Sequence, residues 1–303
     1  MNETAPGLAE ILGHFAFDPP WYAAVLVVAG LYGAALRHVL LARPRVPPSR
    51  LRAVAFLLGL VLVLVATQSP LEHYGNQLLW ADFAGMFLLT MAAPPLILLG
   101  APLTLAFRAN GKQGRARLRH LYRGRFARVV GMPIVAWLLF AVVTYSWQFT
   151  SLTEQAATNV FVRDAQQLTL LAVGLLFWWP ALCADPVPWR MGHPLRVLYV
   201  AVEMTHKGLF GGMFLSLNTP VHETFAANAP LWSISAMADQ RLAILILWVG
   251  GSLVFLVALV AVAISWVAYD ARSAARIDRR LDRERRLRGE RSRALGGVFE
   301  RPR

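Results

Sequence analysis

Four chemically versatile residues interrupt an otherwise apolar stretch of this sequence at 195–217. They are Glu203, Met204, His206 and Lys207. On a helix Glu203 and Lys207 are one turn apart and can pair, and His206 lies on the same side as Glu203. Imidazole and thioether groups are also ligands that suit copper. The pattern predicts either a charge pair that locks helices together or a soft-metal site that includes His206 and Met204.

A second group of polar residues lies at the starts of two other apolar stretches. Asp82 and Met86 are four residues apart in the stretch 78–103, and the stretch 160–183 begins with Arg163, Gln166 and Gln167. Ionisable groups inside a membrane are costly and need partners, so we expect Asp82 to pair with Arg163. Asp82 and Met86 are also candidate metal ligands, together with His206 and Met204.

Other reactive patterns are sparse. Three pairs outside the apolar stretches are weaker metal candidates: His14 with Asp18, Glu72 with His73, and His222 with Glu223. The single cysteine excludes an internal disulfide and a CxxC metal site. The sequence has no nucleophile elbow, phosphate loop or pair of carboxylates at catalytic spacing, so we expect a protein that is not an enzyme.

These residues must be positioned by long apolar helices. Each of seven stretches is long enough to cross a hydrocarbon core of about 30 Å, and their continuous apolarity favours helices over strands. We therefore expect an all-α bundle of seven transmembrane helices, with an outer segment at 1–20, a membrane domain at 21–268 and an Arg-rich cytoplasmic tail at 269–303. The predicted spans are 21–42, 53–69, 78–103, 129–149, 160–183, 195–217 and 242–268.

The distribution of charge predicts the orientation. Lys and Arg concentrate in alternate gaps between the stretches and in the tail. The segment before the first stretch contains acidic residues but no Lys or Arg. Because short cytoplasmic loops retain basic residues, the N-terminus is expected outside and the C-terminus in the cytoplasm. The net charge of +13 then reflects topology and anionic lipid rather than nucleic-acid binding. We expect the last helix to continue to about residue 293 and to stop at Gly296 and Gly297.

Several stretches, in this order and spacing, resemble the polytopic CtaG-type cytochrome c oxidase assembly proteins, the seven-span group rather than the single-span copper chaperone of the same name. The resemblance covers nearly the whole chain. The matching stretches are Ser69-Pro70-Leu71, Ala93-Pro94-Pro95-Leu96 through Gly100-Ala101-Pro102, Trp147, Gly174 to Pro180, and Asp239-Gln240 followed by Trp248.

The sequence departs from the family pattern where the family carries histidines. The resemblance implies two histidines ahead of the double proline, a Trp-His pair late in the fourth span, and a His and a Glu-His at the start of the fifth. The corresponding residues here are Asp82, Met86, Gln148, Arg163, Gln166 and Gln167. Arginine does not ligate metal and glutamine is a poor ligand. Either metal is handled differently, through His206, Met204 and Met86, or only the scaffold is kept.

The resemblance implies an assembly factor for a haem-copper oxidase in a bacterial inner membrane. Its expected partners are membrane lipid and either oxidase subunits or a copper donor protein, and copper delivery on the outer face is one form of this function. The alternatives are a metal-free membrane scaffold, and a small-solute or ion transporter that uses Asp82, Glu203 and His206. A retinal-type receptor is disfavoured because 242–268 contains no lysine.

Overall fold

The computed structural model describes residues 18–44 and 46–299, and every regular element within these ranges is a helix. The expected all-α class is therefore confirmed. The helices are α2 (Pro19–Leu41), α3 (Arg50–Gln68), α4 (Pro70–Gly75), α5 (Leu79–Phe87), the π-helical turn η1 (Leu88–Ala92), α6 (Ala93–Leu99), α7 (Pro102–Ala109), α8 (Lys112–Arg123), α9 (Arg125–Val130), α10 (Pro133–Phe149), α11 (Leu152–Thr158), α12 (Val160–Leu182), α13 (His193–Leu215), α14 (Glu223–Asn228), the 3-10 turn η2 (Ala229–Trp232), α15 (Ala236–Leu245), the π-helical turn η3 (Ile246–Gly250) and α16 (Gly251–Phe299).

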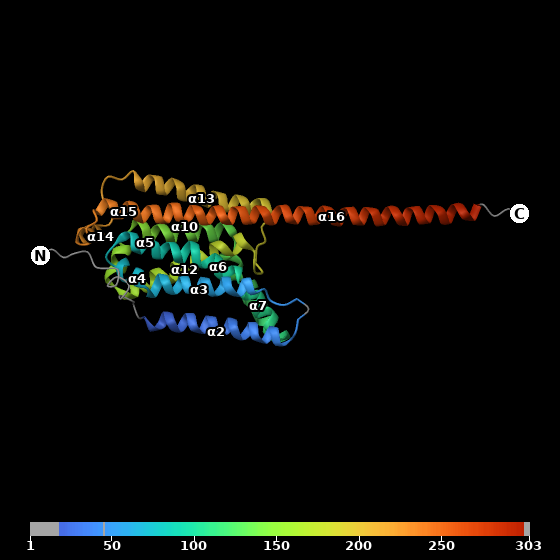
Figure 1. Ribbon diagram of the computed structural model, residues 1–303, viewed down its shortest axis with the longest axis horizontal. Helices are drawn as coiled ribbons and strands as arrows, with labels where there is room; N and C mark the ends of the chain where they lie inside the picture. Colours follow the sequence, from blue (N-terminus) through green and yellow to red (C-terminus); the bar gives the residue numbers. More distant parts are fainter. Residues whose placement is uncertain (1–17, 45, 300–303) are drawn as a thin grey trace.

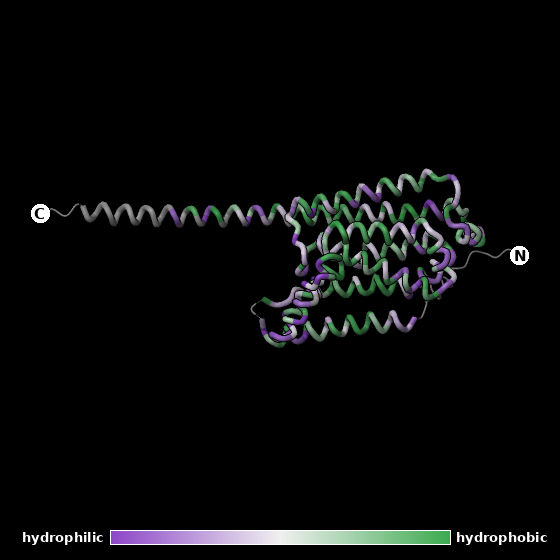
Figure 2. Tube along the Cα trace, turned by 180° about the vertical axis from the view of Figure 1, so that it is seen from behind, coloured by the Kyte–Doolittle hydropathy of each residue, from purple (hydrophilic) through white to green (hydrophobic). Residues whose placement is uncertain are grey.

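The long helices lie side by side in a bundle, and α16 extends far beyond it (Figure 1). The short helices α4 and α14 lie at one end of the bundle, and α7 lies at the other. Apolar residues follow the bundle helices along most of their length, and polar residues gather near both ends (Figure 2). This distribution is what a hydrocarbon layer around the middle of the bundle requires.

Five helical segments in the described part of the chain are long and apolar enough to cross a membrane. The bent pair α10 and α11, with 67° between its halves, is a sixth candidate. Helix α13 has the necessary length of 23 residues, but it is not among these candidates. Its Glu203, His206 and Lys207 reduce its apolarity. Several candidate membrane-spanning helices are thus present, whereas the count of seven and the orientation stay predictions.

The third apolar segment accommodates its tandem proline within a helix. The chain stays helical through Pro94 and Pro95, and a π-helical turn precedes them. The carbonyl of Thr90 would normally bond to the amide four residues on, which Pro94 lacks. Instead the indole of Trp178 donates to this carbonyl at 3.1 Å. Gly174 permits the close approach, because an added Cβ would lie 2.8 Å from Pro94 Cγ.

Two predicted boundaries need correction. The fourth span begins at Pro133 rather than 129, because α9 ends at Val130 and residues 131–132 separate the two helices. Helix α16 continues to Phe299, so Gly296 and Gly297 do not end it. Glycine costs about 1 kcal/mol inside a helix but does not forbid one. Residues 1–17, including His14, and 300–303 lie outside the described residues, and the proposed division into domains stays a prediction.

Candidate functional site

A buried arginine joins three helices at the end of the bundle that holds α4. Arg163 lies one turn into α12 and is only 8% exposed. Its guanidinium donates to both carboxylate oxygens of Glu72, at 2.7 and 3.0 Å, and also to Asp82. It further donates to Oε1 of Gln166 at 3.2 Å, and Gln167 donates to Glu72 at 2.6 Å. We call these five residues the Arg163 cluster.

Local sequence signals place each member of the cluster. The hydroxyl of Ser69 accepts from the amide of Leu71 and so caps α4, whose first turn carries Glu72. Asn159 caps α12 in the same way, one turn before Arg163. The first turn of α5 carries Asp82. The backbone amides of Leu79 and Trp80 at the start of this helix donate to the carboxylate of Asp239 on α15. Such caps satisfy the backbone donors that a helix start leaves free.

The cluster contains two carboxylates and one cation, so its formal charge is negative. Asp82 Oδ2 and Gln166 Nε2 have no hydrogen-bond partner among the described residues. A guanidinium has five donors in a planar fork, which suits it to bridging carboxylates from different helices. The arrangement can hold α4, α5 and α12 together. The expected pairing of Asp82 with Arg163 is therefore confirmed, and so is the contact between the third and fifth predicted spans.

A polar cleft of about 370 Å³ opens beside the cluster. Its lining includes Glu72, Arg163 and the acidic residues Asp18 and Asp164. The indole of Trp21 donates to Asp164 at 3.3 Å, which attaches the start of α2 to α12. Burial and the neighbouring Asp164 carboxylate raise the pKa of Asp18. Negatively charged side chains therefore outnumber positively charged ones in the lining of this cleft.

Two of the four candidate metal ligands line the same cavity. Asp82 and Met86 line the cavity around Arg163, and His206 does not. Met204 packs against the hydrophobic core, and residues two apart on a helix, as Met204 and His206 are, do not share a face. No group of three or more His, Cys, Asp or Glu residues in the described ranges could hold a metal ion. A metal site built from His206, Met204, Met86 and Asp82 is therefore not supported by the geometry.

The weaker metal pairs are used otherwise. Glu72 binds Arg163 rather than acting with His73. His222 is 3% exposed, and its ring nitrogen Nε2 lies 2.9 Å from the backbone carbonyl of Gln148. Burial lowers the pKa of this imidazole.

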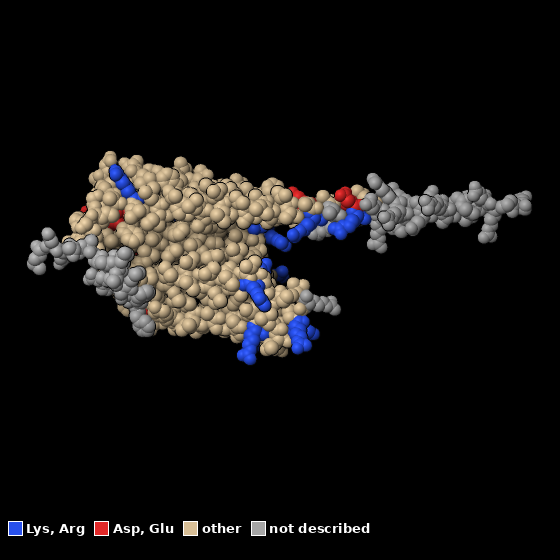
Figure 3. All heavy atoms as spheres, in the orientation of Figure 1, with Lys and Arg blue, Asp and Glu red and all other residues tan. Residues whose placement is uncertain are grey.

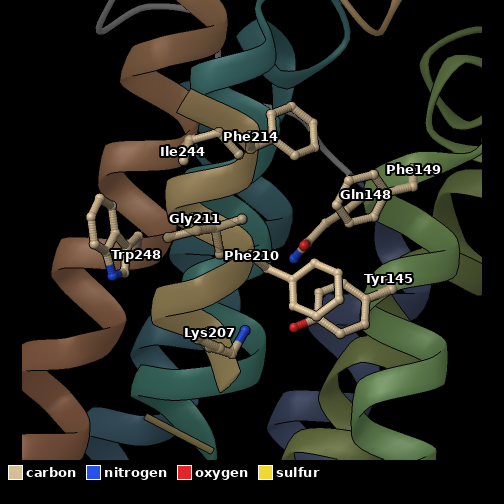
Figure 4. Close-up of a pocket in the computed structure, with 10 residues that line it drawn as sticks. Tyr145, Gln148, Phe149, Lys207, Phe210, Gly211, Phe214, Ile244 and Trp248 are labelled. Carbon is tan, nitrogen blue, oxygen red and sulfur yellow. The ribbon is translucent and has the colours of Figure 1, made fainter. Parts of the chain in front are cut away.

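The prediction of an ion pair between Glu203 and Lys207 is wrong. The ion pairs of the described residues do not include it. The Lys207 ammonium instead lies 5.2 Å from the centre of the Phe140 ring. Glu203 Oε2 is 3.4 Å from Nδ1 of His206, which is also 3.3 Å from the hydroxyl of Tyr145. Figure 4 shows Lys207 on α13 and Tyr145 on α10 pointing toward one another across an aromatic groove. We call Glu203, His206, Lys207 and Tyr145 the Lys207 group.

Three acidic residues have structural roles that the sequence did not reveal. Glu72 completes the Arg163 cluster, and Asp239 caps α5. Asp185 accepts from the amides of Leu103 and Thr104 and so caps α7. Asp239 belongs to a stretch that carried the family resemblance, but no pattern in the sequence predicted its partner. The Ser69-Pro70 helix start was the available signal for Glu72, since it places this residue in a first turn.

The positions at which the resemblance implied histidines mostly converge. Asp82, Met86, Arg163, Gln166 and Gln167 line one small cavity, whereas Gln148 lies in the aromatic groove. In this chain the converging residues form an ion pair with amide neighbours. The helices and this buried cluster define a multi-pass membrane protein whose polar core joins separate helices.

The comparisons with known proteins place this protein in a family. The chain belongs to the cytochrome c oxidase caa3 assembly factor family (Caa3_CtaG), whose model matches residues 19–268. The resemblance deduced from the sequence is therefore confirmed.

Relatives that match most of the chain include proteins of mycobacteria. Uncharacterized proteins of Mycobacterium bovis and Mycobacterium tuberculosis are each 30% identical over 286 residues, and one of Mycobacterium leprae is 28% identical over the same length. These matches cover 91% of this chain but only 43% of each relative. The chain thus spans less than half the length of these relatives. No solved structure matches the chain.

Proposed function

We propose that this protein is an assembly factor for a haem-copper oxidase in the bacterial plasma membrane and that it works as a scaffold without a resident metal. Family membership supports the assembly role. The bridging of Glu72 and Asp82 by Arg163 supports the scaffold role. Oxidase subunits are the proposed partners, and the proposal assigns no catalytic step to the chain.

The residues present do not suit copper. The cavity around Arg163 offers one thioether, from Met86, and carboxylates already engaged by a guanidinium. A copper ion there would have to displace the cation of Arg163 or lie beside it, and no imidazole or thiolate lines this cavity. The scaffold is therefore favoured over copper delivery and over a transporter that uses Asp82, Glu203 and His206.

We also propose seven spans, with the Arg163 cluster at the outer side. On the face shown in Figure 3, most Lys and Arg residues lie at the end from which α16 emerges and along that helix. Basic residues mark the cytoplasmic side, so the polar cleft would face outward. There it could contact an oxidase subunit during assembly.

Deletion of the gene tests the assembly role. We expect lower oxidase activity and lower levels of the oxidase subunits, without recovery when copper is added to the medium. Re-expression of Arg163→Gln should fail to restore the oxidase, whereas the exposed variant Arg117→Gln should succeed. Recovery by copper alone would contradict the scaffold and favour copper delivery. Normal oxidase levels in the deletion strain would contradict the assembly role.

Labelling with a membrane-impermeant thiol reagent tests the orientation. In a Cys183→Ala background, cysteines introduced at Ser151 and Asn228 should react in cells whose outer membrane, where present, is permeabilised. A cysteine introduced at Arg115 should react only after the plasma membrane is disrupted. Reaction at 115 in intact cells would reverse the proposed topology.

A further inference from the structure

Two cavities adjoin at the basic end of the bundle, where α2 meets α3 and α7. The first, of about 290 Å³, lies between the start of α3 and α7, and its lining includes Ser49, Arg52 and Arg108; we call it the basic pocket. The second, of about 220 Å³, lies between α2 and α7; we call it the apolar groove. Tyr32 and Leu105 line both cavities, so the two lie next to each other.

The basic pocket has unused hydrogen-bond donors. Arg108 donates to the carbonyl of Val46 at 2.5 Å, which uses one of its five N–H groups. The side chain of Arg52 makes no hydrogen bond or ion pair with another described residue. The carboxylate of Asp185, across α7, has both oxygens occupied by the first turn of that helix. Two arginines with free donors, in a pocket whose lining includes no carboxylate, favour an anion.

The apolar groove opens toward the lipid. Val28 and Leu31 on α2 form its outer wall and are 43% and 67% exposed. Tyr32 stacks on Phe56 with 3.9 Å between the ring centres, and its hydroxyl donates to the carbonyl of Gly100. The polar atom of Tyr32 is thus satisfied within the protein, and the groove presents hydrocarbon to its occupant.

We infer that this double cavity binds an anionic phospholipid. The phosphate would lie in the basic pocket against Arg52 and Arg108, and an acyl chain would lie in the apolar groove against α2. A free phosphate would use only the pocket, and a neutral lipid only the groove. An anionic phospholipid would use both the pocket and the groove. Basic pockets between membrane helices are known to hold lipid head groups. The bound lipid would fasten α2 to the rest of the bundle.

Native mass spectrometry of the purified full-length protein in detergent tests this inference. Titration with phosphatidylglycerol should show binding at least about tenfold tighter than phosphatidylcholine. Arg52→Gln/Arg108→Gln should weaken phosphatidylglycerol binding by roughly thirtyfold, since each basic residue near a membrane surface contributes about 1 kcal/mol. The control Arg117→Gln/Arg119→Gln, at two exposed positions of α8, removes the same charge and should leave binding unchanged.

A second variant tests the groove. Ala106→Trp should fill it and weaken phosphatidylglycerol binding while both arginines remain. Thermal unfolding in phosphatidylcholine micelles confirms that each variant is folded. Equal binding of the two lipids, or an equal loss in the α8 control, would overturn the inference. Competition by millimolar inorganic phosphate as effective as that by phosphatidylglycerol would assign the pocket to free phosphate and would also overturn it.

Discussion

The Arg163 cluster and the Lys207 group place charged residues in the same bundle with opposite results. Arg163 contacts carboxylates from two other helices, α4 and α5, and an amide from its own. Lys207 has a glutamate one turn away on its own helix and yet makes no ion pair with it. Its ammonium lies over the ring of Phe140 on α10 instead. The charges of the cluster are paired across helices, whereas the ammonium of Lys207 has an aromatic ring as its neighbour.

The difference follows from the side chains and from what the neighbouring helices supply. A guanidinium fork can satisfy several acceptors at fixed angles, and three helix starts converge around Arg163. An ammonium is a compact charge on a flexible stem. A spacing of four residues permits a pair but contributes only about 0.2–0.5 kcal/mol, which packing between helices easily overrides. Partners from other helices therefore decide whether a buried charge is paired.

Removal of Arg163 should have the largest effect. Arg163→Gln leaves Glu72 and Asp82 buried without their cation, and breaking a buried pair typically costs about 3–5 kcal/mol. We expect a large drop in the thermal unfolding temperature of the purified protein in detergent.

The triple variant Glu72→Gln/Asp82→Asn/Arg163→Gln is the matched control, because it strands no charge. It should be more stable than Arg163→Gln, and the intermediate Asp82→Asn/Arg163→Gln should lie between them because Glu72 remains. If the single and triple variants unfold at the same temperature, the cluster is not the electrostatic unit described here.

The contrast also shows how much of this site the sequence could predict. The pairing of Asp82 with Arg163 follows from two opposite charges at the same expected depth. The third partner, Glu72, lies in a short loop helix, and no periodicity predicts which way it turns. The apolar runs predict the helix positions to within a few residues. However, they do not predict that the indole of Trp178 replaces the missing amide of Pro94, since that contact depends on the packing of α12 against η1.

His222, outside the predicted spans, is a third buried group that can carry charge. Its ring has one backbone partner, the carbonyl of Gln148. Burial lowers its pKa below the ordinary 6.5, so the unfolded chain binds the proton more readily. Stability should be fully present above about pH 6.5 and should fall as the pH decreases, by at most about 1.4 kcal/mol per pH unit for one proton. Urea unfolding at several pH values measures this slope. His222→Asn should reduce it, and an unchanged slope in that variant would exclude His222 as its source.

His206 shows how an apparent ligand becomes part of the packing. Its ring lies among Trp137, Tyr145 and Phe210, with ring centres 5.0–5.2 Å apart. We expect no stoichiometric copper in the purified wild-type protein, as measured by elemental analysis. His206→Ala should lower stability by about 1 kcal/mol, because the hydroxyl of Tyr145 loses its side-chain partner. Copper that is bound by the wild type and lost in His206→Ala would contradict the metal-free scaffold.

Lys207→Met should have the smallest effect and gives the sharpest contrast with Arg163. The ammonium makes no ion pair that could be broken; the carboxylate of Glu203 acts on it only at longer range and lies beside His206. Methionine keeps the length and flexibility of the side chain and removes the cost of burying a charge. We expect thermal stability unchanged within about 1 kcal/mol, or slightly increased, since replacing buried ions by apolar groups is often neutral or favourable. The matched variant Arg163→Met should be strongly destabilised. A comparable loss in both would mean that Lys207 has a partner in solution, and the division between a paired cluster and an unpaired lysine would fail.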